Sequence, residues 1–560
     1  MAGNGPDIVK RHDRLEAAAA QHYYRWERMA PYLAPSRVGI QTEQAPGESR
    51  TRGVYDSTSM MAAELMAMFV AGHIINPSQQ WLDFSMKQFN RIDPIREWLD
   101  ECRVIALKHV DASLYYAEQP EAFIDWAGFG TGCLMVEEAP QPVNLTKTGF
   151  RGFLFGAERT GRFLIQDGPD GVVDTLFRRF KMTARVINER WPQASLPENI
   201  QNKLKTGRGD DQFTIIHSVY PRSKGERASY GTIEAGTTMP WASCWVEKES
   251  KHLIYESGYR VFPAAVPRYH RTPGEVFGRG RGDIAFPDTW TLNTAKRMGL
   301  EDWALKIRPP ILHGHDSVIG TLKLIPGGPT SVNTHGRPIR DQIMPFETGS
   351  RPEISQIKEE ELRKSIRNIF FVEQILALLE VNKSEMTAFE FARKIELLFR
   401  LMGPVYGRLE WEGLYRIVEV IWDILAYART FPPPPPEVYQ TDGNVDIVFN
   451  NPIAKAQRAG EAESITMVVN DVGALAQNKP EMLDWIDTDK MMRGVMETRG
   501  MPARWQRSER EVAALRAERQ KQMQTEMQLE QASQVAEAAG KAAPALQILQ
   551  GGAAGVTKKQ

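Results

Sequence analysis

The sequence predicts an α+β fold that is mainly α-helical, and three observations support this class. Helical periodicity dominates residues 7–35, 55–75 and 92–139. Residues 150–275 instead alternate short β-rich runs with polar and glycine-containing turns, which is typical of an antiparallel sheet. From residue 287 the helical pattern returns, interrupted by a segment rich in glycine and proline.

Length and composition indicate an ordinary globular protein of two to four packed units. The chain has 560 residues, of which 42% are hydrophobic and 25% charged. Its net charge of −1 provides no basic excess for gripping nucleic acid through its phosphates. This charge balance argues against tight, sequence-independent DNA binding. It does not exclude a channel through which DNA slides.

We expect no membrane span and a reducing cytoplasm as the setting of the chain. The longest apolar run, residues 60–75, is too short for a bilayer and contains Glu64 and His73. The N-terminus lacks the apolar core of a signal peptide. The three cysteines lie far apart, without the spacing of a metal site or a disulfide framework.

The first part of the chain reads as a series of helices. Residues 7–35 form the first, and residues 55–75 the second, with Asp56 or Ser57 as its N-cap and Pro77 beyond its end.

The helical pattern of residues 92–139 ends in a glycine cluster. Gly128, Gly130 and Gly132 mark a turn before a short apolar strand.

Five runs between residues 150 and 275 predict the strands of the sheet. They are "RFLIQD", "VVDTLFRRF", "QFTIIHSVY", "ASCWVEK" and "HLIYESGYRVF". One helix, around "TARVINERW", interrupts them. We therefore expect an antiparallel sheet with a helical insertion.

Two long helices flank a small excursion in the following segment. The first spans residues 287–307 and stops before Pro309 and Pro310. Residues 311–349 are rich in glycine and proline, with short β pieces. The second helix follows a capping box at Ser350 and Glu353 and continues to Val381, a length of about 40 Å.

A short polar loop and two further helices come next. Residues 382–386 precede a helix with a capping box at Thr387 and Glu390, which stops near Gly403 and Pro404. A third helix, residues 406–429, ends at a run of prolines that predicts a stiff connector.

The rest of the chain is expected to be largely helical. Residues 450–505 look helical, and the last fifty residues read as a long polar helix or a loose tail.

The stretch "VFGRGRGDIAF" raises the question of a phosphate-binding loop. Gly278, Gly280 and Gly282 give the spacing G-x-G-x-G, whereas a dinucleotide fold requires G-x-G-x-x-G between a strand and its helix. We expect no helix to begin before Pro287. The favoured interpretation is a flexible or sharply turning junction, where Arg279 and Arg281 pair with neighbouring acids; phosphate contact is the alternative.

Other catalytic signatures are missing from the sequence. The one Gly-Lys pair, Gly540-Lys541, is followed by alanine, so there is no Walker A loop. The sequence contains neither H-E-x-x-H nor G-x-S-x-G. His313 and His315, in "HGHD" with Asp316, could hold a metal, but no third ligand is visible and surface histidines in a turn are commoner. We predict no catalytic, cofactor or metal site.

Four stretches taken in order resemble the portal, or head-to-tail connector, proteins of short-tailed bacteriophages. They are residues 54–86, 126–138, 277–312 and 386–414, and the resemblance extends from about residue 10 to residue 475. Each stretch alone is only moderately specific, whereas their order and spacing make the match strong.

The resemblance implies a structural protein without enzymatic activity or cofactor. Members of the family form a ring, usually of twelve subunits, around a DNA channel at one capsid vertex. The implied partners are double-stranded DNA without sequence specificity, the terminase motor, tail adaptor proteins, and the major capsid and scaffolding proteins. The implied location is the virion, after assembly in the bacterial host cytoplasm, with no membrane involved.

The same resemblance divides the chain into the segments of a portal. They are a wing (1–286, with N-terminal helices 1–139 and the sheet region 150–275), a first stem helix (287–310), a clip (311–349), a second stem helix (350–381), a tunnel loop (382–387), wing and crown helices (388–430), a crown (431–505), and a C-terminal helical barrel or disordered tail (506–560).

The resemblance also nominates three groups of functional residues. The DNA-facing tunnel loop would comprise Asn382, Lys383, Ser384, Glu385, Met386 and Thr387. The wing–stem hinge would comprise Gly278, Arg279, Gly280, Arg281 and Gly282. The clip would include Ile311, His313, His315, Asp316 and Lys323.

The sequence leaves three alternatives to the portal interpretation. In the first, the chain is a monomeric helical protein, and Lys383 and Glu385 are solvated turn residues in it. The chain could instead be another capsid or tail structural protein, or a nucleic-acid enzyme using carboxylates that sequence does not single out. For a portal subunit we expect an exposed apolar stripe on a stem helix, since the subunit interface must be apolar somewhere.

Overall fold

A computed structural model describes most of the chain, and all structural statements below concern its described residues. These are residues 4–42, 44–45, 47–78, 80–86, 93–139, 150–222, 239–313, 318–319, 331–332, 336, 338, 343–345, 352–379, 394, 397, 402–440, 445–449, 467–468, 487–498, 507, 511–529 and 531.

The chain divides into two compact units. The first consists of Met1–Ser85, Glu101–Pro433 and Val445–Gly460, and the second of Met86–Asp100, Pro434–Asn444 and Glu461–Gln560. Among the described residues, no helix is both long enough and apolar enough to cross a membrane.

The expected N-terminal helices are present. They are α1 (Gly5–Leu33), the short 3-10 helix η1 (Pro35–Arg37), α2 (Thr58–Ile74), α3 (Asp93–Asp111) and α4 (Tyr115–Phe129). Ser57 occupies the N-cap position of α2, but Asp56 supplies the hydrogen bond, because its Oδ1 accepts from the Thr58 N–H at 2.9 Å. Both residues expected at this cap therefore take part in it.

Two antiparallel sheets follow, where the sequence predicted one. The smaller has the order β3 (Phe153–Ala157), β2 (Leu134–Glu138), β9 (Ala264–Ala265). The larger has the order β4 (Phe163–Asp167), β5 (Val173–Thr183), β6 (Gln212–Pro221), β7 (Trp241–Glu247), β8 (Leu253–Tyr259). All five runs singled out in the sequence lie in the larger sheet, which confirms that expectation.

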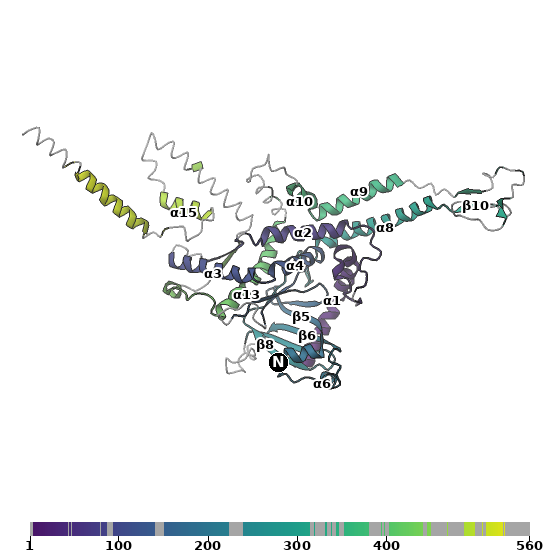
Figure 1. Ribbon diagram of the computed structural model, residues 1–560, viewed down its shortest axis with the longest axis horizontal. Coiled ribbons are helices and arrows are strands. Elements are labelled where there is room, and N and C mark those ends of the chain that lie inside the picture. The colour runs from purple at the N-terminus through teal and green to yellow at the C-terminus, as the bar shows by residue number, and fades with distance from the viewer. Residues whose placement is uncertain are drawn as a thin grey trace, which may run out of the picture. The chain divides into compact units, whose positions relative to one another are not determined.

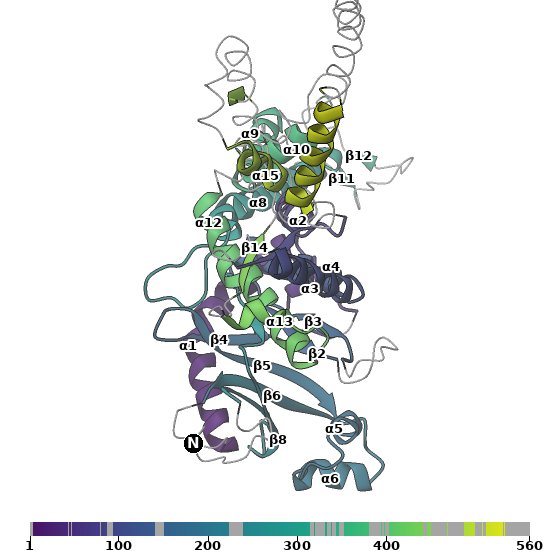
Figure 2. The same ribbon diagram turned by 90° about the vertical axis from the view of Figure 1, so that its left-hand side faces the viewer.

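Two helices pack at one end of the larger sheet (Figure 2). The expected helix is α5 (Ala184–Arg190), and α6 (Glu198–Lys205), which the sequence did not indicate, follows it. Ile187 and Ile200 of these helices share a buried apolar cluster with Trp245 of β7. This cluster explains why so short a helix as α6 is held in place.

The first of the two long helices, α8 (Arg281–Ile307), begins earlier than expected. The prediction that no helix starts before Pro287 is wrong, because Pro287 lies inside α8. Gly280 is the N-cap, and its N–H donates to Asp283 Oδ2 at 2.9 Å. This bond and the burial of Gly282 and Ala285 offset the backbone hydrogen bond that a proline inside a helix cannot donate.

A small β excursion separates α8 from the next helix, as expected (Figure 1). Strand β10 (Ile311–His313) pairs antiparallel with β13 (Ile343–Pro345). Strand β11 (Val318–Ile319) pairs antiparallel with β12 (Ser331–Val332). The chain therefore goes out along α8, turns through these strands and returns along α9 (Pro352–Ile369), which packs against α8.

The second long helix is broken, whereas the sequence predicted one continuous helix to residue 381. Helix α9 ends at Ile369 and α10 (Val372–Leu379) begins after Phe370 and Phe371. Phe371 adopts a left-handed backbone with φ 58°, and the Arg281 guanidinium lies 4.5 Å from the centre of its ring. Phe370 is fully buried, so packing at the break overrides the local helical preference.

The third expected helix is confirmed, and it begins at Gly403, slightly before its predicted start. It consists of α12 (Gly403–Arg408), a π-helical turn η4 (Leu409–Leu414) and α13 (Tyr415–Tyr427). Strand β14 (Asp446–Phe449) pairs antiparallel with β1 (Leu82–Ser85) in the same unit. The sequence indicated neither strand.

The second unit contains the short 3-10 helix η5 (Pro436–Gln440), α15 (Thr488–Thr498) and a helix over residues 511–529. Arg516 and Asp489 form an exposed ion pair within it, with Nη1 2.5 Å from Oδ2. The helix over residues 511–529 agrees with the expectation of a long polar helix there. Most of residues 450–505 and the end of the chain lie outside the described residues.

Candidate functional site: the glycine junction and the base of the helix pair

Two glycine clusters, far apart in the sequence, pack backbone against backbone where α4 ends and α8 begins. Gly130 ends α4 in a left-handed conformation with φ 91°. A Cβ atom on Gly130 would lie 2.5 Å from Gly280 N, and one on Gly280 would lie 2.7 Å from Gly130 N. Gly278 and Gly282 likewise face Gly130 and Gly128 too closely for any side chain. We call this contact the glycine junction.

Hydrogen bonds donated by backbone N–H groups close the glycine junction. Gly278 N–H donates to Thr131 Oγ1 at 2.8 Å, Arg279 N–H donates to the His270 carbonyl at 2.8 Å, and Gly280 N–H donates to Asp283 Oδ2. A phosphate in this loop would need these same N–H groups. Their engagement within the protein argues against the phosphate alternative and favours the interpretation as a sharply turning junction.

The two arginines of the junction have different partners. Arg279 pairs with Glu275, with Nε 2.9 Å from Oε2, as expected for an arginine beside acids. Arg281 instead donates from Nε to the Tyr269 hydroxyl at 2.7 Å and lies over the Phe371 ring. Arg281 therefore connects the start of α8 to the break between α9 and α10.

Asp283 ties the junction to the first helix of the chain. Its Oδ1 lies 2.9 Å from Arg25 Nε of α1. Burial raises the pKa of Asp283, although the Arg25 charge opposes that shift. The side chain thus caps α8 and joins it to α1.

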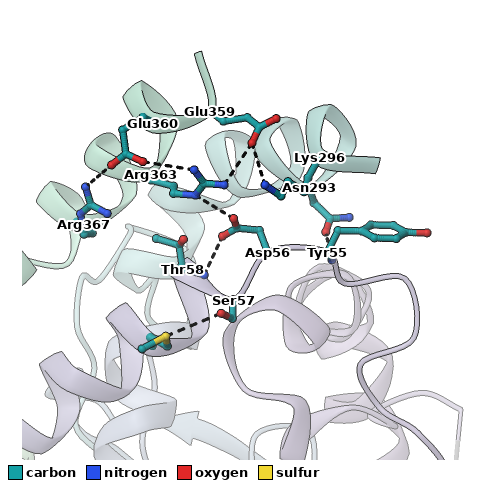
Figure 3. Close-up of polar contacts among 11 residues, drawn as sticks. Tyr55, Asp56, Ser57, Thr58, Asn293, Lys296, Glu359, Glu360, Arg363 and Arg367 are labelled. Carbon is teal, nitrogen blue, oxygen red and sulfur yellow. Dashed lines mark hydrogen bonds and ion pairs between the residues drawn. The ribbon is translucent and has the colours of Figure 1, made fainter. Parts of the chain in front are cut away.

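A polar network fixes the base of the α8–α9 pair against the start of α2 (Figure 3). Asn293 of α8 is buried, accepts from the Tyr55 N–H at 2.7 Å and donates to the Gly53 carbonyl at 3.0 Å. Asp56 accepts from Arg363 Nε of α9 at 3.0 Å through Oδ2. Burial would raise the pKa of Asp56, but hydrogen bonds from Thr58 and Arg363 hold it below its ordinary value.

The same network joins α8 directly to α9 (Figure 3). Glu359 is buried on α9, and its Oε2 lies 3.2 Å from Lys296 Nζ of α8 and 3.3 Å from Arg363 Nη2. Ser365 Oγ donates to Asp288 Oδ2 at 2.6 Å. Directional bonds about two turns apart fix the rotation and register of the two helices, which apolar contact alone would leave adjustable.

A buried arginine anchors the third helix to the sheets. Arg268 is fully buried, and its Nη1 lies 2.8 Å from Asp167 Oδ1 at the end of β4. Its Nη2 lies 2.8 Å from Glu412 Oε1 of the π-helical turn. Burial lowers the pKa of Arg268, but the carboxylates of Glu412 and Asp167 more than compensate and raise it.

The structure describes only some of the residues nominated from the sequence. It brings the hinge residues Gly278 to Gly282 together with the glycine cluster of α4, a partnership that the sequence did not indicate. It places Ile311 and His313 in β10. His315, Asp316, Lys323 and the whole tunnel loop, residues 382–387, lie outside the described residues.

One cluster in the described part of the chain has the residue types of a metal site. His12, Asp13 and Glu16 of α1 lie close together. Arg179 Nη1 lies 2.9 Å from Glu16 Oε1, and Lys248 Nζ lies 3.3 Å from Glu16 Oε2. Because these cations already neutralise the carboxylates, we assign no metal there.

Sequence reasoning missed most of the structural polar residues, including Asn293, Glu359, Arg363 and Arg268. Asn293 carried a usable signal, because asparagine in the middle of a helix is unfavourable unless its side chain has a partner. The charged residues carried no such signal in the sequence, since glutamate, lysine and arginine are common on exposed helix faces.

The polar groups of this site hold helices and sheets together. The family model that matches residues 6–506 describes a bacteriophage head to tail connecting protein. The chain belongs to this family.

Two curated relatives match along most of their length. The chain is 24% identical over 543 residues to a probable portal protein of Bordetella phage BPP-1, covering 95% of this chain and 94% of the relative. It is 22% identical over 524 residues to the portal protein of Salmonella phage epsilon15, covering 92% and 91%. A chain in a solved virion of a native gene transfer agent particle has 12% identity, covering 77% of this chain and 91% of that chain, with a TM-score of 0.32, which is too low to inform the fold.

These findings confirm the resemblance to phage portal proteins and the mainly helical α+β class. They also confirm the expectation of a structural portal protein over that of an enzyme.

Proposed function

We propose that this chain is the portal subunit of a bacteriophage, one copy of a ring at a single capsid vertex through which double-stranded DNA is packaged and ejected. The observation that carries the proposal is the α8–excursion–α9 unit, locked at its base by Asp56, Glu359 and Arg363. A channel under load needs such a rigid helix pair. The resemblance to portal proteins implies a ring of twelve subunits, and we propose that number for this protein.

The segments of the portal map onto the structure as follows. Helix α8 is the first stem helix, the strands between residues 311 and 349 belong to the clip, and α9 with α10 is the second stem helix. The glycine junction is the wing–stem connection. The backbones of the two glycine clusters pack closely at this connection. Such packing supports a rigid connection that transmits force between the sheet and the stem.

The partners follow from this assignment. The terminase motor, which supplies ATP hydrolysis, docks on the clip, and tail adaptors take its place once the head is full. The major capsid and scaffolding proteins surround the ring during assembly in the host cytoplasm. The finished ring belongs to the virion.

The tunnel loop, residues 382–387, faces DNA in this proposal. In a ring, Lys383 and Glu385 each repeat once per subunit, and their opposite charges nearly cancel at a distance from the loop. Such a lining lets the duplex slide without persistent phosphate contacts. The near-zero net charge of the chain supports this mode of contact.

Deletion of residues 382–386 in the parent phage tests the proposal. We expect rings to assemble, as seen by negative stain, while heads contain shorter or fewer genomes by pulsed-field electrophoresis. A control that replaces the five residues by a Gly-Ser loop of equal length separates loop length from loop chemistry. Full-length genomes at normal yield in the deletion variant would count against the tunnel-loop assignment.

A further inference from the structure

Helix α2 carries an apolar stripe on the side that faces away from the protein. Met61 is 66% exposed and Met68 is 44% exposed. A spacing of seven residues places them on one face, two turns apart. Exposed Glu64 and Gly72 share this face, and a side chain at Gly72 would meet only open space. We call Met61, Glu64 and Met68 the α2 stripe.

Helix α8 carries a second apolar stripe. Ile284, Met298 and Leu305 are 51%, 57% and 41% exposed. Their spacings of 14 and 7 residues again place them close to one face. The opposite face of α8 contains the buried residues Thr289 and Asn293 in its first half, and the exposed residues Leu300, Trp303 and Ile307 toward its end. We call Ile284, Met298 and Leu305 the α8 stripe.

The hydrogen bond between Ser59 and Thr289 shows how the two stripes are oriented. Ser59 Oγ of α2 and Thr289 Oγ1 of α8 are 2.5 Å apart, and both side chains are buried. Ser59 lies two residues before Met61, which at about 100° per residue places it on the far side of α2. Thr289 lies nine residues before Met298, which places it about 180° away on α8. The two stripes therefore lie on opposite sides of the α2–α8 pair.

Two unlike surfaces on opposite sides of the α2–α8 pair suit head-to-tail packing between copies. We propose that the α2 stripe of one copy packs against the α8 stripe of the next copy, an inference that rests on the proposed ring function. Such a heterologous contact leaves each copy with a free surface for another, and the series closes into a ring when the rotation between copies divides a full turn, as the proposed function requires. A self-complementary dimer would require the same surface on both partners.

Charge and side-chain chemistry favour pairing between unlike stripes. Glu64 lies in the α2 stripe, and Arg297, which is half-exposed, lies beside Met298 and pairs with Glu301, Nε 3.8 Å from Oε1. Pairing of two α2 stripes would bring Glu64 against its own copy, whereas the α8 stripe brings it near a pair of opposite charges that does not repel it. The flexible methionines of the α2 stripe can adapt to the branched side chains of the α8 stripe.

Two double variants test the pairing. Met61→Asp with Met68→Asp disables the α2 stripe, and Ile284→Asp with Met298→Asp disables the α8 stripe. All four side chains are exposed, so thermal unfolding monitored by circular dichroism should show that both variants fold. We expect each variant alone to sediment as a 63.3 kDa monomer under conditions where the wild-type chain forms rings.

The mixture of the two variants provides the decisive measurement. Each retains the stripe that the other has lost, so exactly one contact can form between them. We expect an equimolar mixture to give a species of twice the monomer mass and no rings. Val186→Asp, a similar change at a 39% exposed residue of α5, is the matched control and should leave rings intact.

Several outcomes would overturn the pairing. Rings formed by either double variant would show that its stripe is dispensable, and a mixture that stays monomeric would show that the stripes do not meet. If a double variant proves unfolded, the single change Met61→Asp or Met298→Asp takes its place, and unchanged ring yield would contradict the contact. A wild-type chain that stays monomeric at every concentration would overturn the claim that the stripes hold copies together. Genome packaging in the parent phage would still test the portal function separately.

Discussion

Gly130 and Gly280 lie so close that neither position can carry a side chain. A Cβ atom on Gly130 would lie 2.5 Å from Gly280 N, and a Cβ atom on Gly280 would lie 2.7 Å from Gly130 N. The end of α4 and the start of α8 thus meet through bare backbone. The glycines of the junction serve this close packing of backbone against backbone.

Gly280→Ala is expected to destabilise the protein by about 1–3 kcal/mol, because the backbone must shift to accommodate the methyl group. Its φ of −95° allows any residue, so the effect comes from the contact alone. Chemical denaturation of the purified chain measures the loss. Gly407→Ala on α12 is the control, since a methyl group there meets open space and alanine favours a helix. Equal stability of both variants would contradict the packed junction.

Arg268→Ala is expected to cost about 3–5 kcal/mol, because Asp167 and Glu412 would lose a buried partner. Arg271 provides a matched control. It pairs with the same Asp167 at 2.9 Å, but its side chain is 39% exposed. Arg271→Ala should therefore cost about 0–1 kcal/mol. Denaturation midpoints of the two variants measure the losses of stability. Similar losses would argue that burial does not determine how much an arginine paired with Asp167 stabilises the fold.

Asp56→Ala is expected to cost about 1–2 kcal/mol, because the N-terminus of α2 loses its capping acceptor and Arg363 loses a partner. Ser57→Ala should change stability by less than about 0.5 kcal/mol, since the Ser57 side chain makes no capping hydrogen bond. Thermal unfolding under identical conditions checks both. A larger effect at Ser57 than at Asp56 would reverse the assignment of the cap.

His217 of β6 is expected to make the larger sheet less stable at acidic pH. Burial and the Arg178 charge lower the pKa of His217 well below 6.5. Arg178 Nε donates to Nδ1 at 3.1 Å, so the neutral ring has its proton on Nε2, which lies 2.9 Å from Ser243 Oγ. Below pH 6.5 the unfolded chain binds a proton at this histidine that the folded chain does not.

The stabilisation from neutral His217 is therefore present above pH 6.5 and is lost as the pH falls, by up to about 1.4 kcal/mol per unit. Denaturation curves between pH 7 and pH 5 measure the slope. His217→Gln keeps a hydrogen-bonding side chain without the titration, and its slope should be shallower. An identical slope in wild type and variant would contradict a neutral, buried His217.

The sequence alone predicted most elements, because hydrophobic period and turn residues are local signals. It failed where packing overrode them. Pro287 suggested a helix start, but capping by Asp283 and burial of Gly282 begin α8 earlier. The helical pattern through Phe371 suggested one helix, but burial of Phe370 breaks it. Strands β1 and β14 are too short for a local signal and exist because they pair with each other.

The sequence by itself determined the class of the protein, the helix–excursion–helix order and the positions of both glycine clusters. Tertiary structure alone decided that the clusters meet, and that Arg268 finds partners 101 and 144 residues away in Asp167 and Glu412. Only the tertiary structure placed the α2 and α8 stripes on opposite sides of the Ser59–Thr289 contact. Periodicity depends on neighbours along the chain, whereas these contacts depend on which distant segments the core brings together.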